Sequence, residues 1–398
     1  MQYPTMLTFC FDRMSSPGVL GYPNLAQESL LPDQFDYTWP RAIPCRLFVY
    51  FKRHNINVDQ CLVSDAPNGA WYPIGIGWFD FDCDYISLIP KSTIHRIQTG
   101  DIKILFYYHE GDNPMRIKSR IDSLLTTHNL PTNSYVFISA NSSAVNLKQF
   151  YFFSDHEFFF HYINRRQDAT TIDTQPRSYQ FTALNRSHKW WRASVMTDLR
   201  RSKLLNNSLW SYNTTIDTGD REEDNPLQLD IDDSWRQEVN EFISQGPYFC
   251  DCADANLHND HRFVFTSLYT ESYCQLILET HFDADGSNGA FITEKTYKCF
   301  KYGQPFVMIG PPGTLRILRE HGYRVFDHAI DNSYDDIIDN TQRWLCIKKI
   351  ITELSKKDMH EWFLNCLPDI KHNQELFLSG NRKNLVALAD YLNIHRQR

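Results

Sequence analysis

The stretch Phe291–Asp327 constrains the fold more than any other part of this chain, because helix-length segments alternate in it with short apolar runs. In order, it contains a helix bounded by Thr293 and Gly303, the apolar run Phe306–Ile309, a helix over Thr314–Glu320 and the apolar run Tyr323–Phe326. Glycine-containing turns separate these segments. Short apolar strands that alternate with helices in this way indicate parallel α/β structure.

The start of the first helix in this stretch contains the candidate ligand-binding residues. Thr293 is suited to the N-cap position, and Glu294 and Lys295 follow it in the first turn. A helix N-terminus presents unpaired N–H groups and about half a positive charge, so it attracts phosphate, and Lys295 adds a full cation. Glu294 is able to accept hydrogen bonds from ribose hydroxyls. The alternative is that Glu294 only complements the helix dipole and Lys295 is a solvated surface residue.

A family resemblance favours the first interpretation. The run Phe291-Ile292-Thr293-Glu294-Lys295, an apolar-aromatic helix, Gly303-Gln304-Pro305, a buried strand and Gly310 resemble the donor-binding motif of α1,3-fucosyltransferase-like enzymes. The motif is also similar to that of related bacteriophage glycosyltransferases. Leu276–Glu279 stands for the family's strand that ends in Glu, and Thr280-His281 replaces the Asn-Ser that follows it there. The resemblance covers about 50 residues and implies that Glu279, Thr293, Glu294 and Lys295 bind the ribose and diphosphate of a sugar donor.

A second basic segment lies earlier in the chain. The predicted strand Tyr179–Leu184 runs into Asn185-Arg186 and a basic cluster that opens a helix, which is again an anion-binding arrangement. The Asn-Arg segment also resembles the phage glycosyltransferases, and in the fucosyltransferase-like group a matched Arg grips the diphosphate. The resemblance therefore implies this role for Arg186, assisted by Lys189 or Arg192. The alternative is a solvated basic helix start.

In the N-terminal half, a βαβ unit places one carboxylate at the end of a strand. The strand Asp101–Tyr108 ends in His109-Glu110-Gly111-Asp112, and a helix over Met115–Thr126 leads to the strand Tyr135–Ser139. Ligands of open α/β sheets collect at the carboxyl ends of the strands, so Glu110 stands where a catalytic base is expected. The alternative is that Glu110 and Asp112 are ordinary turn residues.

Other parts of this half are less regular. Cys45–Phe51 has the composition of a strand. Alternation from Phe79 to Asp84 places Asp80, Asp82 and Asp84 on one face of a strand, either in an acidic cleft or on a solvated sheet face.

Composition and sequence pattern argue against several classes of protein. The net charge of −8 argues against a protein that holds nucleic acid mainly by its electric field. The ten cysteines form no paired Cys-x-x-Cys sets, which argues against structural zinc and favours reduced thiols in a cytoplasm. No apolar run reaches 18 residues, and the N-terminal residues lack the pattern of a signal peptide, so we expect no membrane span. The expected location is the cytoplasm, that of the host if the chain is phage-encoded.

A possible metal motif is a poor match. Asp283-x-Asp285 imitates a calcium loop, with Glu294 at its end, but Asn288 occupies the position where that loop requires glycine. The pair also imitates the metal-binding Asp-x-Asp of the other large glycosyltransferase architecture. We therefore expect no metal and read the segment as a polar loop over the donor site.

The length of 398 residues fits two domains. We predict an α/β fold with two facing Rossmann-like domains, the GT-B-type architecture that the resemblance implies. The acceptor-binding domain is expected over residues 1–165, a linker over 166–178 and the donor-binding domain over 179–370. A helical segment over 371–398 is expected to pack back on the first domain.

The predicted function is transfer of a sugar from a nucleotide-diphosphate sugar to a hydroxyl of a glycan, a protein or a phage DNA base. Glu110 takes the acceptor proton, with Asp80 and Asp82 next in line, and the donor is a substrate, so no cofactor is expected. One alternative is a non-catalytic module that binds nucleotide sugars or glycans. An epimerase or dehydrogenase needs Gly-x-Gly-x-x-Gly near the N-terminus, and none is present.

Overall fold

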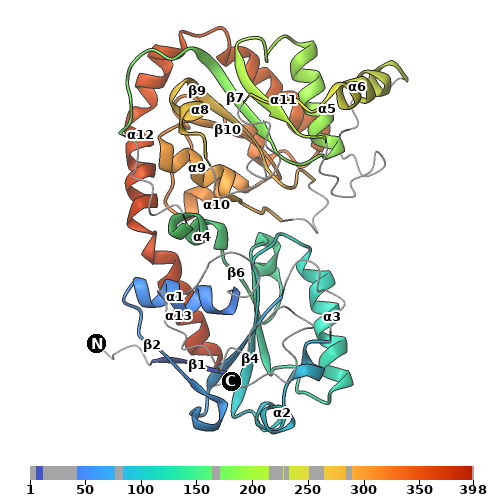
Figure 1. The fold of residues 1–398 in the computed structure, drawn as a ribbon, viewed down its shortest axis with the longest axis vertical. Helices are drawn as coiled ribbons and strands as arrows, with labels where there is room; N and C mark the ends of the chain where they lie inside the picture. Colours follow the sequence, from blue (N-terminus) through green and yellow to red (C-terminus); the bar gives the residue numbers. More distant parts are fainter. Residues whose placement is uncertain are drawn as a thin grey trace. The chain divides into compact units, whose positions relative to one another are not determined.

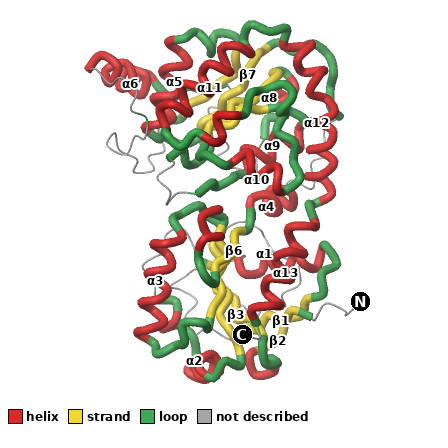
Figure 2. The backbone as a smooth tube through the Cα atoms, turned by 180° about the vertical axis from the view of Figure 1, so that it is seen from behind, coloured by secondary structure: helices red, strands yellow, loops and turns green. Residues whose placement is uncertain are grey.

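The structure is a computed structural model that describes residues 6–11, 43–76, 84–163, 171–214, 227, 233–250, 264–283 and 289–396. The chain divides into two compact units. The first comprises Met1–Phe159 together with Asn381–Arg398, and the second comprises Phe160–Gly380. In each unit, strands are covered by helices and loops (Figures 1 and 2).

The first unit contains a six-stranded sheet in the order β2-β1-β3-β4-β5-β6, in which all pairings are parallel. Its strands are β1 (Leu7–Phe11), β2 (Val58–Leu62), β3 (Ala70–Gly75), β4 (Ile102–Tyr108), β5 (Tyr135–Ser139) and β6 (Phe150–Phe152). Its helices are α1 (Ile43–Arg53), α2 (Lys91–Gln98), α3 (Pro114–Thr127) and α13 (Arg382–His395), with short turns at Val63–Asp65, Ile86–Leu88 and Ser142–Asn146. Helix α4 (Asp155–Ile163) spans the boundary between the units.

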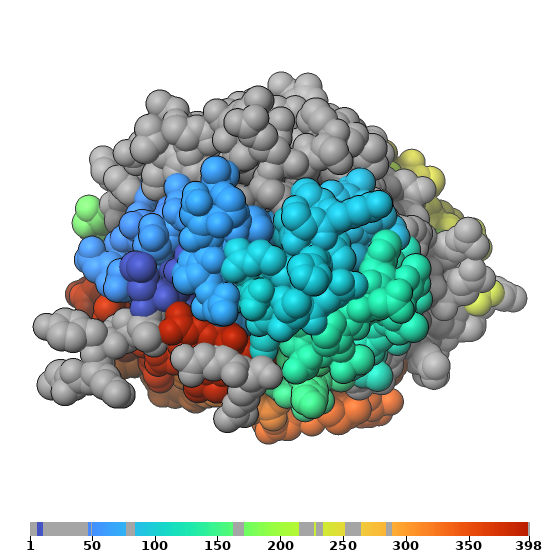
Figure 3. Space-filling model, turned by 90° about the horizontal axis from the view of Figure 1, so that it is seen from below, coloured from blue at the N-terminus to red at the C-terminus, as the bar shows by residue number. Residues whose placement is uncertain are grey.

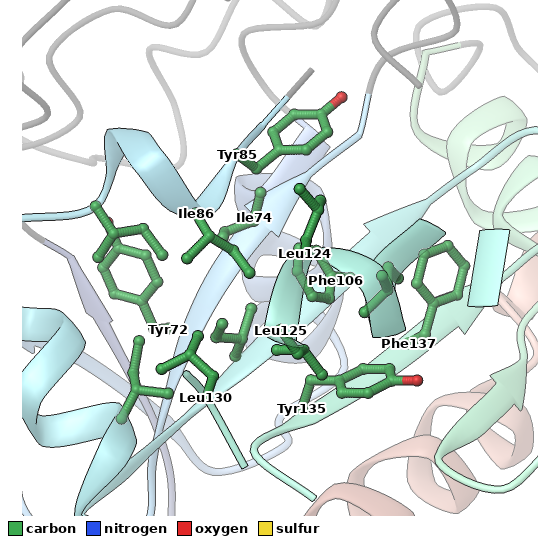
Figure 4. Close-up of a cluster of buried hydrophobic side chains, with 14 of the residues drawn as sticks. Tyr72, Ile74, Tyr85, Ile86, Phe106, Leu124, Leu125, Leu130, Tyr135 and Phe137 are labelled. Atoms are coloured by element: carbon green, nitrogen blue, oxygen red, sulfur yellow. The ribbon is translucent and has the colours of Figure 1, made fainter. Parts of the chain in front are cut away.

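The core of the first unit explains why its strands lack alternation of apolar and polar residues. Every residue of β3, β4 and β5 is buried, as expected for parallel strands that are covered on both faces. Figure 4 shows Tyr72 and Ile74 of β3 beside Phe106 of β4, with Leu124 and Leu125 from α3. The high aromatic content of the sequence is therefore used largely for packing in this unit.

Helix α13 belongs to the first unit although it is far from the rest of it in sequence. The Lys103 amine donates to the His395 carbonyl at 2.8 Å, and the Arg382 side chain donates to the His54 carbonyl at 3.0 Å. Arg396 donates to the Met6 carbonyl at 2.9 Å, beside the start of β1. In Figure 3 the C-terminal segment (red) lies against the dark blue of β1.

The second unit contains a four-stranded parallel sheet in the order β10-β9-β7-β8. Its strands are β7 (Tyr179–Asn185), β8 (Ser208–Tyr212), β9 (Ser272–Leu278) and β10 (Phe306–Ile309). Its helices are α5 (Trp190–Arg201), α6 (Asp233–Gln245), α8 (Thr266–Thr270), α9 (Glu294–Tyr302), α10 (Thr314–Glu320), α11 (Asn340–Leu354) and α12 (Met359–Ser379), with a short turn at Ser333–Asp336.

The direction of winding reverses inside the second sheet. From β7 the chain passes through α5 to β8 at one edge, returns to β9 on the other side of β7, and continues through α9 to β10. Right-handed crossovers in opposite directions place α5 and α9 on opposite faces. Accordingly, α9 packs against α12 and α5 packs against α6. The ends of β7 and β9 therefore form a topological switch point, where open α/β sheets bind ligands.

The expected α/β class with parallel sheets is confirmed, as are the helices that begin after Thr293 and Gly313. The strand expected at Cys45–Phe51 is wrong, because these residues lie inside α1. In α1, Leu47, Tyr50 and Phe51 are buried while Lys52 is exposed, which is the spacing of a helix with one apolar face.

A further expected strand is wrong. At Tyr323–Phe326 the side chains are buried, but the Tyr323 N–H bonds to the Leu318 carbonyl and the Arg324 N–H bonds to the Asn373 side chain, which leaves no ladder. Val264 and Phe265 form no strand and precede α8. The short turn Ser333–Asp336 precedes α11.

Candidate functional site

The site is formed where β7 and β9 end at the switch point of the second unit. Arg186 directly follows β7, and Glu279 directly follows β9. Because these strands are neighbours and parallel, both residues lie at the same edge of the sheet. Helix α9, which carries Thr293, Glu294 and Lys295 at its start, leads from β9 to β10.

Glu279 holds the N-terminus of α9. Its side chain is 0% exposed, and its carboxylate accepts hydrogen bonds from the Thr293 N–H at 3.2 Å, the Thr293 hydroxyl at 2.7 Å and the Thr296 hydroxyl at 2.8 Å. Thr293 is the N-cap, as predicted, and its side chain accepts from the Lys295 N–H. Glu279 and Thr293 therefore position the helix, because their polar atoms are occupied by the protein.

Arg192 fixes the other side of the switch point. This residue of α5 is buried, and its guanidinium donates to the Glu279 carbonyl at 3.2 Å and 2.6 Å and to the Ser187 hydroxyl at 3.0 Å. The ring of Trp191 lies beside it. Arg192 thus ties the start of α5 to the end of β9 and keeps the two strand ends in register.

Lys295 is the partly open cation of α9. Its side chain is 24% exposed, and its Nζ lies 2.9 Å from the Thr293 hydroxyl, 3.8 Å from a Glu279 carboxylate oxygen and 4.0 Å from Glu294. Glu294 is also partly buried. The ammonium group is therefore anchored at the helix N-terminus, yet it retains a solvent-facing side for a ligand.

A second lysine of this helix, Lys298, was missed by sequence reasoning. Burial, together with the positive charges of Arg186 and Lys295, lowers its pKa to about 7, although the charge of Glu294 acts in the opposite direction. Lys298 follows Lys295 by three residues and Glu294 by four, which places all three on one face of α9. That spacing was visible in the sequence, but the burial that makes it significant was not.

The predicted basic residues separate into two groups. Arg186 is near α9 and α8, because its charge acts on the pKa of both Lys298 and Tyr269. Lys189 is held toward β8 instead: its N–H bonds to the Tyr212 hydroxyl at 3.3 Å, and that hydroxyl donates to its carbonyl at 3.0 Å. The structure thus brings Arg186 near Lys298 and Tyr269, and it ties the backbone of Lys189 to β8.

The loops after β9 and β10 are joined by Arg343 of α11, which is fully buried. Its guanidinium donates to the carbonyls of Gly310 and Ile337 at 3.2 Å and 2.8 Å and to that of Phe282, whose ring it also covers. Burial lowers the pKa of Arg343 to about 10. This side chain fixes the two loops on either side of the start of α9.

The possible metal motif is only partly described. The Asp283 carboxylate accepts from the Asn340 amide at 2.8 Å, and Asp285 lies outside the described residues. Among the residues that the structure describes, no three His, Cys, Asp or Glu side chains are grouped to hold a metal ion.

In the first unit, Glu110 lies just after the end of β4. Its carboxylate is 3.2 Å from the Nε2 atom of His109, and its side chain is 28% exposed. Asp112, by contrast, accepts a hydrogen bond from the Tyr108 hydroxyl, and burial raises its pKa. The Gly111 carbonyl between them accepts from the Asn141 amide at 2.7 Å. Glu110 is therefore the more open carboxylate of this turn.

The switch point of the first sheet lies between β1 and β3, one strand away from β4. The chain that follows β3 carries Asp80 and Asp82, which lie outside the described residues, as does the rest of 77–83. Asp84 is described, and it caps the turn Ile86–Leu88 through the N–H groups of Ile86 and Ser87.

None of the described helices is both long and apolar enough to cross a membrane. Comparison with protein-family models, with curated proteins and with solved structures found no match to this chain.

Proposed function

We propose that this protein is a glycosyltransferase that takes its sugar from a nucleotide-diphosphate donor. The observation that carries the proposal is the convergence of Arg186, Lys295 and Lys298 at the start of α9, where the sheet changes its direction of winding. Cations at a helix N-terminus bind phosphate, and a switch point is the usual place for a nucleotide.

In this proposal, Arg186, Lys295 and the positive end of the α9 dipole stabilise the diphosphate as it leaves the anomeric carbon, because negative charge develops on it at that moment. Glu294, in the first turn of α9, accepts hydrogen bonds from the ribose hydroxyls. Glu279 and Arg192 hold the helix start and the strand ends in place. The protein's own cations thus supply charge stabilisation for the leaving group.

The acceptor hydroxyl needs a base, and we assign this role to Glu110. A general base must be reachable by its substrate, and the partial exposure of Glu110 meets that condition. His109 contacts the same carboxylate and is placed to orient it. The proposal requires the two units to meet over one donor, as in a GT-B-type architecture, with the acceptor a glycan, a protein or a modified nucleic acid.

Calorimetric titration with UDP, GDP, ADP and CDP tests the donor site. We expect at least one nucleotide to bind, and Arg186→Ala and Lys295→Ala each to weaken its binding by about 1.5–3 kcal/mol, since each removes charged hydrogen bonds. Lys371→Ala, which removes an exposed cation from α12, is the matched control and is expected to bind as the parent does.

Parent-like binding by both site variants would locate the nucleotide elsewhere. With the nucleotide identified, its sugar conjugates are assayed for transfer and for slow hydrolysis. Binding without either reaction would favour the non-catalytic module instead.

A further inference from the structure

Lys298 of α9 is a largely buried lysine in the second unit. Its side chain is 4% exposed, and its Nζ lies 5.8 Å from the centroid of the Phe160 ring. Within the part of the chain that the structure describes, this amine has no hydrogen-bond acceptor and no carboxylate within ion-pair distance. Burying an amine in this way is unfavourable unless a further group compensates it.

The charged groups around Lys298 are mostly of its own sign. Arg186 follows the end of β7, and Lys295 lies one turn earlier on α9; both lower the pKa of Lys298. Glu294 and the Cys299 thiol raise that pKa. The charges of Arg186 and Glu294 also act on the pKa of Tyr269 in α8. From α12, Phe377 and Gln374 contact α9, and neither side chain titrates.

Lys298 lies on the same side of α9 as the two charged residues of the first turn. Helix α9 is nine residues long and begins beside Arg186, and Lys298 lies on the face that carries Glu294 and Lys295. Three basic side chains thus lie near the N-terminus of α9, where the carboxylates of Glu279 and Glu294 are the negative groups. An anion there would satisfy the amine that the protein leaves without an acceptor.

We propose that Lys298 is a direct phosphate ligand of this site, and that its neutral amine takes a proton from solvent as the anion binds. The new ammonium group then donates hydrogen bonds to the phosphate group between Arg186 and Lys295, and it returns the proton to solvent when the anion leaves. The identity of the anion, the diphosphate of a sugar donor, rests on the function proposed above.

Proton uptake is coupled to anion binding because the anion changes the electrostatic environment of the Lys298 amine. Without the anion, burial and two nearby cations favour the neutral amine, whereas a bound phosphate favours the ammonium form. At pH 8 the free site is therefore mostly uncharged at Lys298, and binding takes up most of one proton. At pH 5.5 Lys298 is already charged, so it contributes no uptake.

The test is calorimetric titration of the full chain at pH 8 with inorganic pyrophosphate and with UDP, GDP, ADP and CDP. Each titration is repeated in buffers that differ in ionisation enthalpy, which reports the number of protons exchanged. We expect net uptake by the parent, and loss of that uptake together with about 10–100-fold weaker binding in Lys298→Met. Lys301→Met is the matched control: this buried lysine flanks the same Phe160 ring from the next turn, and its replacement is expected to leave uptake unchanged.

The parent measurement does not depend on the folding of a variant, so binding by the parent without proton uptake at pH 8 overturns the inference. Uptake that persists in Lys298→Met also overturns it, as does the absence of binding to all five probes. Binding and Lys298-dependent uptake, without sugar transfer from any donor, would leave the inference standing and reject the glycosyltransferase function.

Discussion

The carboxyl ends of the two parallel sheets differ in the charges that they gather. At the second sheet, basic side chains surround Glu279, whose carboxylate is fully buried and accepts three hydrogen bonds from the start of α9. At the first sheet, the turn after β4 gathers two carboxylates, a phenol and a histidine, and Glu110 remains partly open to solvent. One edge is suited to hold an anion, and the other is suited to exchange protons.

The comparison also separates two uses of the same functional group. Glu279 is occupied by the backbone and hydroxyl groups of its own fold, so changing it should affect folding. Glu110 contacts His109 and is partly exposed, so changing it should affect chemistry. The following predictions test this difference, from the largest expected effect to the smallest.

Glu110→Gln is expected to lower turnover by about 10²–10⁴-fold while the nucleotide Kd stays unchanged, because the amide no longer accepts a proton but fills the same space. Both kcat and Kd are measured on the variant, with Glu294→Gln for comparison, which is expected mainly to weaken donor binding. Normal turnover in Glu110→Gln would remove it as the base and make Asp80 and Asp82 the next candidates.

Glu279→Gln is expected to lower the free energy of unfolding by about 2–4 kcal/mol, because the amide nitrogen replaces one of the two acceptor oxygens and then faces either the Thr293 or the Thr296 hydroxyl, which donates there in the parent. Urea unfolding followed by fluorescence measures the change. Glu294→Gln, one residue into the same helix but partly exposed, is the control and should lie within about 0.5 kcal/mol of the parent. Equal stability of the two variants would contradict a structural role for Glu279.

Lys298→Met is expected to raise the free energy of unfolding at pH 7 by about 1–3 kcal/mol, since an apolar side chain of similar length replaces a buried amine. The native pKa of Lys298 is about 7, below its usual value of 10.5, so the unfolded chain binds more protons between these values. The parent should therefore gain stability as the pH rises from 7 toward 10.5, and Lys298→Met should lack this increment. Urea unfolding of both proteins at pH 7 and pH 9 is the measurement. If the free energy of unfolding changes equally with pH in the parent and in Lys298→Met, the buried amine is already compensated.

Asp84→Ala, in the first unit, is expected to cost about 1 kcal/mol, because it removes the cap of the turn Ile86–Leu88. Burial alone would raise the pKa of Asp84, but the hydrogen bonds from His128 and from the Ser87 and Ile86 N–H groups outweigh it and hold the pKa below 3.8. The contribution is therefore present above pH 3.8 and is lost as the pH falls through the native pKa. Thermal unfolding is the measurement, and Asp84→Asn, which keeps a cap acceptor, should recover most of the loss.

Local patterns predicted much of the second unit because the relevant interactions are close in sequence. Thr293 caps α9, and Gly303 ends that helix with the positive φ of 67° that favours glycine. In the first unit the βαβ segment around α3 follows from the same kind of pattern.

The remainder depends on contacts between distant residues. The burial of Lys298 beneath Phe160 and the bonds from Glu279 to residues 14 and 17 positions later have no local pattern. Tyr323–Phe326 has a strand's composition, but Asn373 of α12 takes the hydrogen bond that a neighbouring strand would otherwise make.

The return of α13 to the first unit has a consequence for synthesis. A ribosome completes the second unit at Gly380 before it has made Asn381–Arg398, whose hydrogen bonds to the Lys103 and Met6 segments complete the first. The N-terminal unit is therefore the last to reach its full set of contacts, which reverses the usual order of folding during translation. Until that segment is synthesised, the Lys103 amine and the Met6 carbonyl lack these hydrogen bonds, and a chain that stopped near residue 380 would never form them.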